Sequence, residues 1–87
     1  MTSIAPNPAK GPATIEYTLP RASNVELSVM DVQGRVVAVL SKGALGGGRH
    51  QAVWSGQTIR GTASSGLYFV RLKTTDATDI RKLMIAR

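Results

Sequence analysis

The sequence predicts an all-β domain, built as a sandwich or a barrel of short antiparallel strands. Along its 87 residues, short stretches rich in Val, Ile, Leu, Thr and Tyr recur between Gly, Pro, Asn and Asp. This spacing is typical of such folds. No stretch shows the apolar period of an amphipathic helix of useful length. A chain of this length accommodates one domain, which we place at residues 12–87.

Residues 1–11 are expected to form a linker and edge segment. Pro6 and Pro8 flank Asn7 in this segment, and a proline cannot donate a backbone hydrogen bond to a neighbouring strand. Two prolines this close together therefore exclude a central strand.

Six strands are predicted from their apolar and β-branched residues, at residues 14–19, 24–30, 35–40, 50–54, 68–73 and 80–86. A seventh is expected from the N-terminal segment or from the polar connection at residues 57–65. The third strand contains the run Val36-Val37-Ala38-Val39-Leu40. Because this run has no polar alternation, we expect it to be buried on both faces.

Tight turns are predicted where Asp and Gly stand between strands. Asp31 opens the turn before the third strand and can accept a hydrogen bond from the backbone two residues further on. Gly34 tolerates a positive φ at the end of this turn, and Arg35 starts the strand. Gly66 is expected where a Cβ atom would clash as the chain enters its last hairpin.

The aromatic residues favour packing over ligand binding. Trp54, Tyr17 and Tyr68 fit inward strand positions, so we expect them in the core. Phe69 falls on the opposite face from Tyr68. A carbohydrate-binding module would instead display aromatic rings on an open surface.

Few residues are available for catalysis or for metal binding. The chain has no Cys, a single His at position 50 and five scattered carboxylates. A zinc site needs three or four such ligands, and general acid–base catalysis needs positioned groups. We therefore expect no enzyme activity, no cofactor and no metal.

The net charge is +6, from 11 Lys and Arg against 5 Asp and Glu. The basic residues are spread singly, apart from the adjacent Arg81 and Lys82, and no nucleic-acid-binding motif is present. We expect a solvated basic surface, an anionic glycan or lipopolysaccharide as the alternative partner, no nucleic acid, and a monomer. No signal peptide opens the chain, so we expect any export signal upstream, in a longer protein.

The chain ends in a predicted hairpin whose second arm is also its C-terminus. Leu83 and Ile85 alternate with Lys82 and Met84, which predicts two buried and two outward side chains. Chain ends usually fray, so a terminus inside a strand indicates that this end is fixed or recognised. The pattern favours a C-terminal address or anchor. The edge of this strand is also expected to offer backbone groups for strand addition by a partner.

Six motifs, taken in order, resemble one known family. They are Pro6-Asn7-Pro8, Leu19-Pro20, V-E-L-S-V-M-D-V-Q-G-R-V-V from Val25, G-R-H-Q-A-V-W-S-G from Gly48, Ser65-Gly66-Leu67-Tyr68 and Arg81-Lys82-Leu83-Met84-Ile85. Their order and spacing resemble the C-terminal sorting domain of type IX secretion cargo (the Por secretion system family). They also resemble the related Ig-like domain of the flagellar hook-capping protein. The chain departs from the family pattern at Ser55, where Asp or Asn is frequent, and at Met30, where an aromatic is frequent.

The resemblance implies an Ig-like or fibronectin-III-like sandwich of about seven antiparallel strands at the C-terminus of a large exported protein. It implies that outer-membrane secretion machinery reads the module, that the cargo passes through the periplasm to the cell surface, and that the cargo is joined to anionic lipopolysaccharide or stays anchored. The residues expected to contact this machinery are Arg81, Lys82, Met84 and Arg87. Two alternatives stay open: a carbohydrate-binding accessory module of a secreted glycoside hydrolase, and a structural spacer domain.

Overall fold

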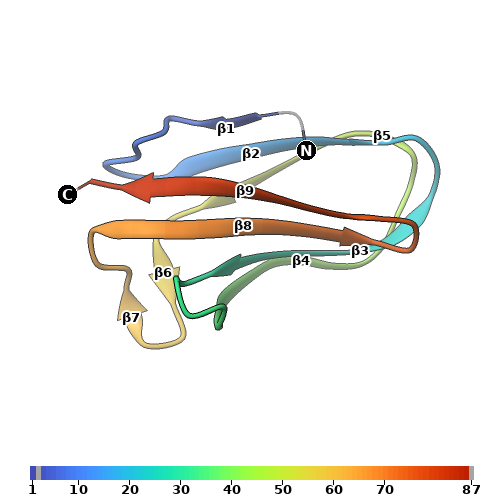
Figure 1. Ribbon diagram of the computed structural model, residues 1–87. Coiled ribbons are helices and arrows are strands. Elements are labelled where there is room, and N and C mark those ends of the chain that lie inside the picture. Colours follow the sequence, from blue (N-terminus) through green and yellow to red (C-terminus); the bar gives the residue numbers. More distant parts are fainter. Residues whose placement is uncertain (2, 87) are drawn as a thin grey trace.

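The computed structural model describes residue 1 and residues 3–86, and this part of the chain contains strands and their connections but no helix (Figure 1). The strands are β1 (Ser3–Ala5), β2 (Ala13–Leu19), β3 (Ser23–Met30), β4 (Val36–Leu45), β5 (Gly48–Trp54), β6 (Gln57–Thr58), β7 (Gly61–Thr62), β8 (Gly66–Thr74) and β9 (Thr78–Ile85). All paired strands run antiparallel. The predicted all-β fold is therefore confirmed. Within the described residues no helix is available to cross a membrane.

The predicted number of about seven strands is wrong, since the described residues form nine. Both segments considered as the source of a seventh strand contribute: β1 comes from the N-terminal segment, and β6 and β7 come from the polar connection after Trp54. β6 and β7 have two residues each and pair with one another in a small separate sheet. A strand of two residues is too short to leave an alternation in the sequence.

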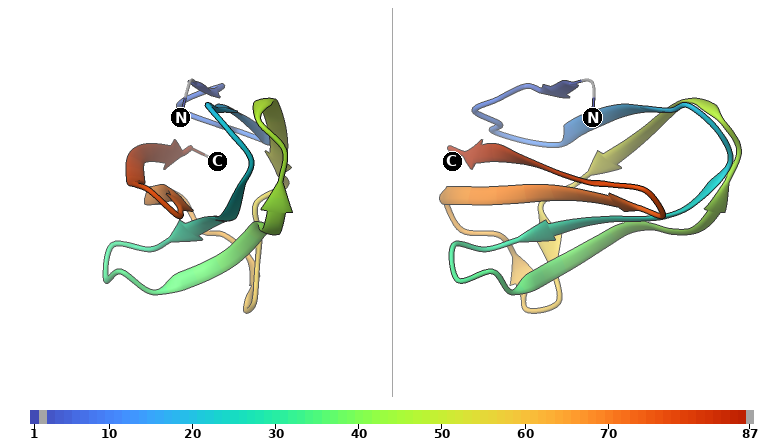
Figure 2. Two further views of the ribbon diagram at one scale, coloured as in Figure 1. Left: turned by 90° about the vertical axis from the view of Figure 1, so that its right-hand side faces the viewer. Right: turned by 45° about the vertical axis from the view of Figure 1, so that its right-hand side comes forward.

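The two larger sheets form the layers of the sandwich, as the end-on view in Figure 2 shows. One sheet has the strand order β1-β2-β5, and the other has the order β4-β3-β8-β9. The chain passes from the first sheet to the second between β2 and β3, and returns between β4 and β5. Both connections lie at the same end of the sandwich, beside the turn that joins β8 to β9 (Figure 2). The opposite end holds the β3–β4 turn and the small β6–β7 hairpin (Figure 1).

The core lies between the two layers and is filled by alternate residues of the facing strands. Its fully buried side chains include Ile15, Leu27, Val29, Val70 and Leu83. Burial of each such side chain is worth about 1.5–3 kcal/mol relative to exposure. The alternation that predicted strands 14–19 and 24–30 therefore corresponds to the burial that stabilises the sandwich.

The expectation that Val36 to Leu40 is buried on both faces is wrong. Val36 is 39% exposed and Val39 is 54% exposed. The reason is that the fold has only two layers, so one face of β4 lies on the core and the other on solvent. Its pairing with β3 also shifts register twice, so a strict alternation along β4 is interrupted.

Candidate partner-recognition surface on the last strand

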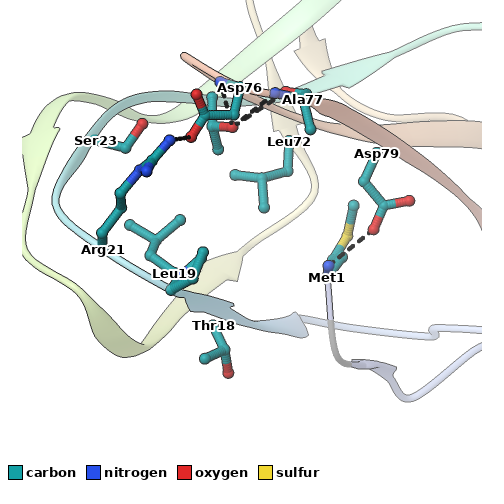
Figure 3. Close-up of a pocket in the computed structure, with 11 residues that line it drawn as sticks. Met1, Thr18, Leu19, Arg21, Ser23, Leu72, Asp76, Ala77 and Asp79 are labelled. Atoms are coloured by element: carbon teal, nitrogen blue, oxygen red, sulfur yellow. Dashed lines mark hydrogen bonds and ion pairs between the residues drawn. The ribbon is translucent and has the colours of Figure 1, made fainter.

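The β8–β9 hairpin carries the residues expected to meet a partner, and its turn is fixed to the rest of the sandwich. The Thr74 hydroxyl accepts hydrogen bonds from the N–H groups of Asp76 and Ala77, at 3.3 and 3.1 Å. Arg21, on the connection from β2 to β3, donates to the Asp76 carboxylate at 2.6 Å (Figure 3). The contact between Arg21 and Asp76 joins the turn to the connection that crosses between the sheets.

A pocket of about 190 Å³ lies between this turn and the β2–β3 connection (Figure 3). It is smaller than the roughly 300–1,000 Å³ typical of small-molecule sites. On its rim the Met1 ammonium group lies 2.8 Å from the Asp79 carboxylate. The pocket is thus bounded by contacts that position the hairpin.

The two faces of β9 carry the predicted side chains. Leu83 and Ile85 point into the core, with 0% and 3% of their surface exposed. Lys82 and Met84 lie on the outer face, together with Ile80. The buried pair therefore holds the outward pair in a fixed position on the sheet.

The other two residues expected at the partner surface lie apart from this pair. Arg81 is on the same side of β9 as Leu83, and its guanidinium donates to the Met1 carbonyl oxygen at 2.7 Å and lies 3.8 Å from the Asp79 carboxylate. Arg87 lies outside the described residues. The structure thus brings together Lys82 and Met84 but not Arg81.

The expectation of a free backbone edge on β9 is wrong for its last residues, because the N-terminal segment covers that edge. The Asn7 carboxamide donates from Nδ2 to the Lys82 carbonyl oxygen at 3.1 Å and accepts from the Met84 N–H at 3.0 Å. The Ala9 N–H donates to the Met84 carbonyl oxygen at 2.8 Å, and the Ala86 N–H donates to the Ala9 carbonyl oxygen at 2.9 Å. Ala9 itself is fully buried.

The side chain of Asn7 explains how a proline-containing segment can cover a strand. Pro6 and Pro8 have no backbone N–H, so this stretch cannot supply a regular ladder. A carboxamide has one acceptor oxygen and a donor nitrogen, as a peptide group does. Asn7 therefore takes the place of a peptide group beside β9. The motif Pro6-Asn7-Pro8 was the available signal, because a polar side chain between two prolines can supply the hydrogen bonds that the prolines lack.

Asp31 stabilises the β3–β4 turn in the way its sequence position predicts. Its Oδ1 atom accepts from the N–H groups of Gln33 and Arg35 at 2.9 and 3.0 Å, and its Oδ2 atom accepts from the Arg35 Nε–H at 2.9 Å. The backbone hydrogen bond from Arg35, opposed by partial burial and aided by the Arg35 side chain, lowers the pKa of Asp31 below 3.8. Gly34 has a φ of 82°, which favours glycine.

The reason expected for Gly66 is wrong, although its conformation requires glycine. A Cβ atom placed on Gly66 would meet no atom within 4 Å. Its φ of 148° is the constraint, because residues with a Cβ atom rarely adopt it. Gly66 therefore serves the backbone geometry at the start of β8.

Trp54 and Tyr68 pack against each other at the end of the core. Their ring centroids are 5.6 Å apart at an interplanar angle of 67°, an edge-to-face arrangement that adds about 0.5–1.5 kcal/mol to burial. The Trp54 Nε1–H donates to the Gln57 carbonyl oxygen at 2.9 Å, and the Tyr68 hydroxyl donates to the Ser64 carbonyl oxygen at 2.8 Å. Both polar atoms thus bind the connection that carries β6 and β7.

The described residues contain no group of three or more His, Cys, Asp or Glu side chains placed to hold a metal ion. His50 stacks on Tyr17 with ring centroids 5.5 Å apart, and its Nε2 atom lies 2.7 Å from the Gly46 carbonyl oxygen. Both contacts tie the β5 strand to its neighbours in the fold.

Comparison with known proteins adds the identity of the domain. No curated protein and no solved structure matches this chain. The family model of the secretion system C-terminal sorting domain matches residues 3–86, which is nearly the whole sequence. The resemblance inferred from the six motifs is therefore confirmed, and the chain belongs to the family of type IX secretion C-terminal sorting domains.

Proposed function

We propose that this domain is a non-catalytic sorting module, which directs an upstream cargo protein across the outer membrane and attaches it to the cell surface. The observation that carries the proposal is the family match over residues 3–86, which identifies a C-terminal sorting signal for type IX secretion. The cargo reaches the outer membrane through the periplasm. The partners are the outer-membrane secretion machinery and, at the cell surface, anionic lipopolysaccharide.

The arrangement of β9 supports a role in recognition. Lys82 and Met84 stand on an exposed face, while Leu83 and Ile85 anchor the same strand in the core. A flexible tail would have to be ordered when a partner binds, at an entropic cost. Here the strand is already fixed on both sides, by β8 and by residues 7–9, so it is presented in one conformation.

Three of the four aromatic residues are buried, all except the half-buried Phe69, and this favours the sorting module over a carbohydrate-binding module. Trp54 is 2% exposed, Tyr17 is 2% exposed and Tyr68 is 8% exposed. A ring at that level of burial has no open face on which a sugar can stack. The spacer alternative predicts a different result when the domain is removed, because export of the cargo would not need a spacer.

A reporter fusion tests the proposal. A fluorescent protein carrying a periplasmic export signal is joined upstream of this domain and expressed in a bacterium with a type IX secretion system. We expect the reporter at the cell surface or in the medium, and we expect the same reporter without the domain to stay in the periplasm. Retention of the fusion in the periplasm, with a domain shown to be folded, would contradict the proposal.

A further inference from the structure

The outer face of the β4-β3-β8-β9 sheet carries apolar side chains that are exposed or half-buried. Strand register places its side chains in rows, because residues directly opposite one another in an antiparallel pair point to the same side. One row consists of Val36, Met30, Phe69 and Lys82, and the next consists of Val39, Ser28, Arg71 and Ile80. The exposed or half-buried apolar residues of this outer face are Val36, Val39, Leu67, Phe69, Ile80 and Met84.

Basic side chains lie among and beside these apolar side chains. Strand register places four basic side chains on the outer face but only one carboxylate, that of Glu26. The basic residues are Lys42, Arg71, Lys73 and Lys82. Glu26 is shared by Lys42 at 3.7 Å and Arg71 at 3.4 Å. Elsewhere in the described chain no carboxylate pairs with Lys73 or Lys82. The outer face therefore has an excess of cations without internal partners.

Buried polar atoms at the centre of this face are also unsatisfied. Ser28 is fully buried and lies directly opposite Arg71. Neither the Ser28 hydroxyl nor the Arg71 Nε atom has a hydrogen-bond partner among the described residues. The Arg71 side chain as a whole is 27% exposed, so part of it is accessible from the outer face.

We propose that the outer face docks a protein whose contact surface carries carboxylates around apolar side chains, and that this protein is the component that reads the sorting signal. The inference rests on the proposed function and deepens it by naming the surface that is read. Residues 7–9 occupy the edge of β9 at Lys82 to Ala86. Recognition therefore proceeds through the side chains of the outer face, with strand addition to that edge excluded while residues 7–9 stay in place.

The charge pattern selects a protein of this chemistry over two other occupants. A second copy of the chain would bring Lys73 and Lys82 against the same cations, and like charges brought together at an interface are unfavourable. A membrane surface is favoured by exposed Trp and Tyr at the interface, but Trp54, Tyr17 and Tyr68 are all buried. Carboxylates on a partner protein would pair with Lys73, with Lys82 and with the exposed part of the Arg71 side chain.

Matched substitutions in the reporter fusion test the proposal. Lys82→Glu reverses a charge on the outer face, and its control Arg49→Glu reverses one on the outer side of the other sheet. Met84→Ser removes an exposed apolar side chain, and its control is Val53→Ser, at a residue that is 58% exposed on β5. We expect each outer-face variant to lower the exported fraction by about tenfold or more, and each control to stay within about twofold of wild type.

Four measurements interpret the result. Circular dichroism melting of each purified domain verifies that the variants fold. A photoreactive residue at position 84 should crosslink to a protein in isolated outer membranes, and this crosslink should be lost with Lys82→Glu. A photoreactive residue at position 53 should give no such crosslink. Vesicles containing phosphatidylglycerol should not bind, and sedimentation should give a monomer.

The outcomes separate this inference from the proposed function. If the wild-type fusion is exported and the folded outer-face variants are exported equally well, the docking face is wrong and the sorting function stands. If the wild-type fusion is not exported, the proposed function itself fails. Vesicle binding that is lost with Lys82→Glu would replace the protein partner by a lipid surface, and a dimer disrupted by Met84→Ser would replace it by a second copy. Either result overturns the proposal.

Discussion

The carboxamide of Asn7 substitutes for a peptide group along the edge of β9, so its removal should weaken the attachment of the N-terminal segment. Asn7→Ala deletes two hydrogen bonds, to the Lys82 carbonyl oxygen and from the Met84 N–H. A hydrogen bond contributes about 0.5–1.5 kcal/mol net. Two such bonds together contribute about 1–3 kcal/mol, and because Asn7 is exposed we place the loss in the lower part of this summed range, at about 1–2 kcal/mol.

The loss should be visible in both global and local measurements. For a domain of this size, it corresponds to a fall in Tm of roughly 4–16 °C. Thermal melts and urea titrations give the global value. Hydrogen exchange gives the local one, because the Met84 N–H loses its acceptor and should exchange faster than in the wild type. Asn7→Asp keeps an acceptor but sets a second oxygen against the Lys82 carbonyl, so it should be no more stable than Asn7→Ala.

A second asparagine provides the matched control. Asn24 is also exposed, on β3, and no side-chain hydrogen bond of Asn24 is present among the described residues. Asn24→Ala should therefore change the free energy of unfolding by no more than about 0.5 kcal/mol. If Asn7→Ala and Asn24→Ala had the same small effect, and the Met84 amide exchanged as in the wild type, the assigned role of Asn7 would be refuted.

Three further substitutions test the core, the β3–β4 turn and the entry to β8. Leu83→Ala should lower the free energy of unfolding by about 2–5 kcal/mol in urea titrations, and Met84→Ala should change it by less than about 0.5 kcal/mol; equal losses would contradict the assigned faces of β9. The folded-state pKa of Asp31 is lowered, so its stabilisation is present above the unfolded pKa and is lost as pH falls through the folded pKa. Asp31→Asn should therefore reduce the fall in Tm on acidification from about pH 7 to about pH 2, and an unchanged pH profile would count against this role. Gly66→Ala should lower the free energy of unfolding by about 1–3 kcal/mol, because its φ of 148° is strained for alanine. The control Gly46→Ala should be close to neutral. A neutral Gly66→Ala would show that the backbone can relax.

Local alternation was sufficient to predict most of the fold. In β9 the sequence K-L-M-I places Leu83 and Ile85 on one face and Lys82 and Met84 on the other, and burial follows this pattern. In β2 the same alternation applies to Ile15 and Tyr17. These predictions succeed because the side-chain period of a strand is fixed by its backbone geometry.

Whether both faces of a strand are covered was not predictable from local pattern. Val36 and Val39 read as residues of a buried strand, yet both lie on the outer face of β4 and are exposed to solvent. A continuous apolar run identifies a strand but does not say whether a neighbour covers its outer face. The β4 face is open here because the β1-β2-β5 sheet covers only the inner side of the β4-β3-β8-β9 sheet.

The partner of residues 7–9 was also not predictable from the sequence, although the motif Pro6-Asn7-Pro8 signals a side chain that can replace backbone hydrogen bonds. Asn7 and Met84 are 77 positions apart, and no periodicity connects them. A proline-flanked asparagine reads as a linker because backbone donors are missing. Its side chain restores the hydrogen bonding only when a strand edge lies beside it, and that edge is supplied by the tertiary fold.

Both edges of the β4-β3-β8-β9 sheet are protected from strand addition. A partner would therefore recognise the face of this sheet, even though the last strand lies at one of its edges. An open edge pairs with other chains and promotes aggregation. Residues 7–9 cover β9, while β4 carries two register shifts and receives a hydrogen bond from the Ile59 N–H at the Val37 carbonyl oxygen. Both edges of the β4-β3-β8-β9 sheet are thus partly blocked, which limits the addition of a strand from another chain. The sheet can then leave its outer face accessible, because apolar rows interspersed with lysines repel a second copy of the same face while remaining complementary to an acidic partner.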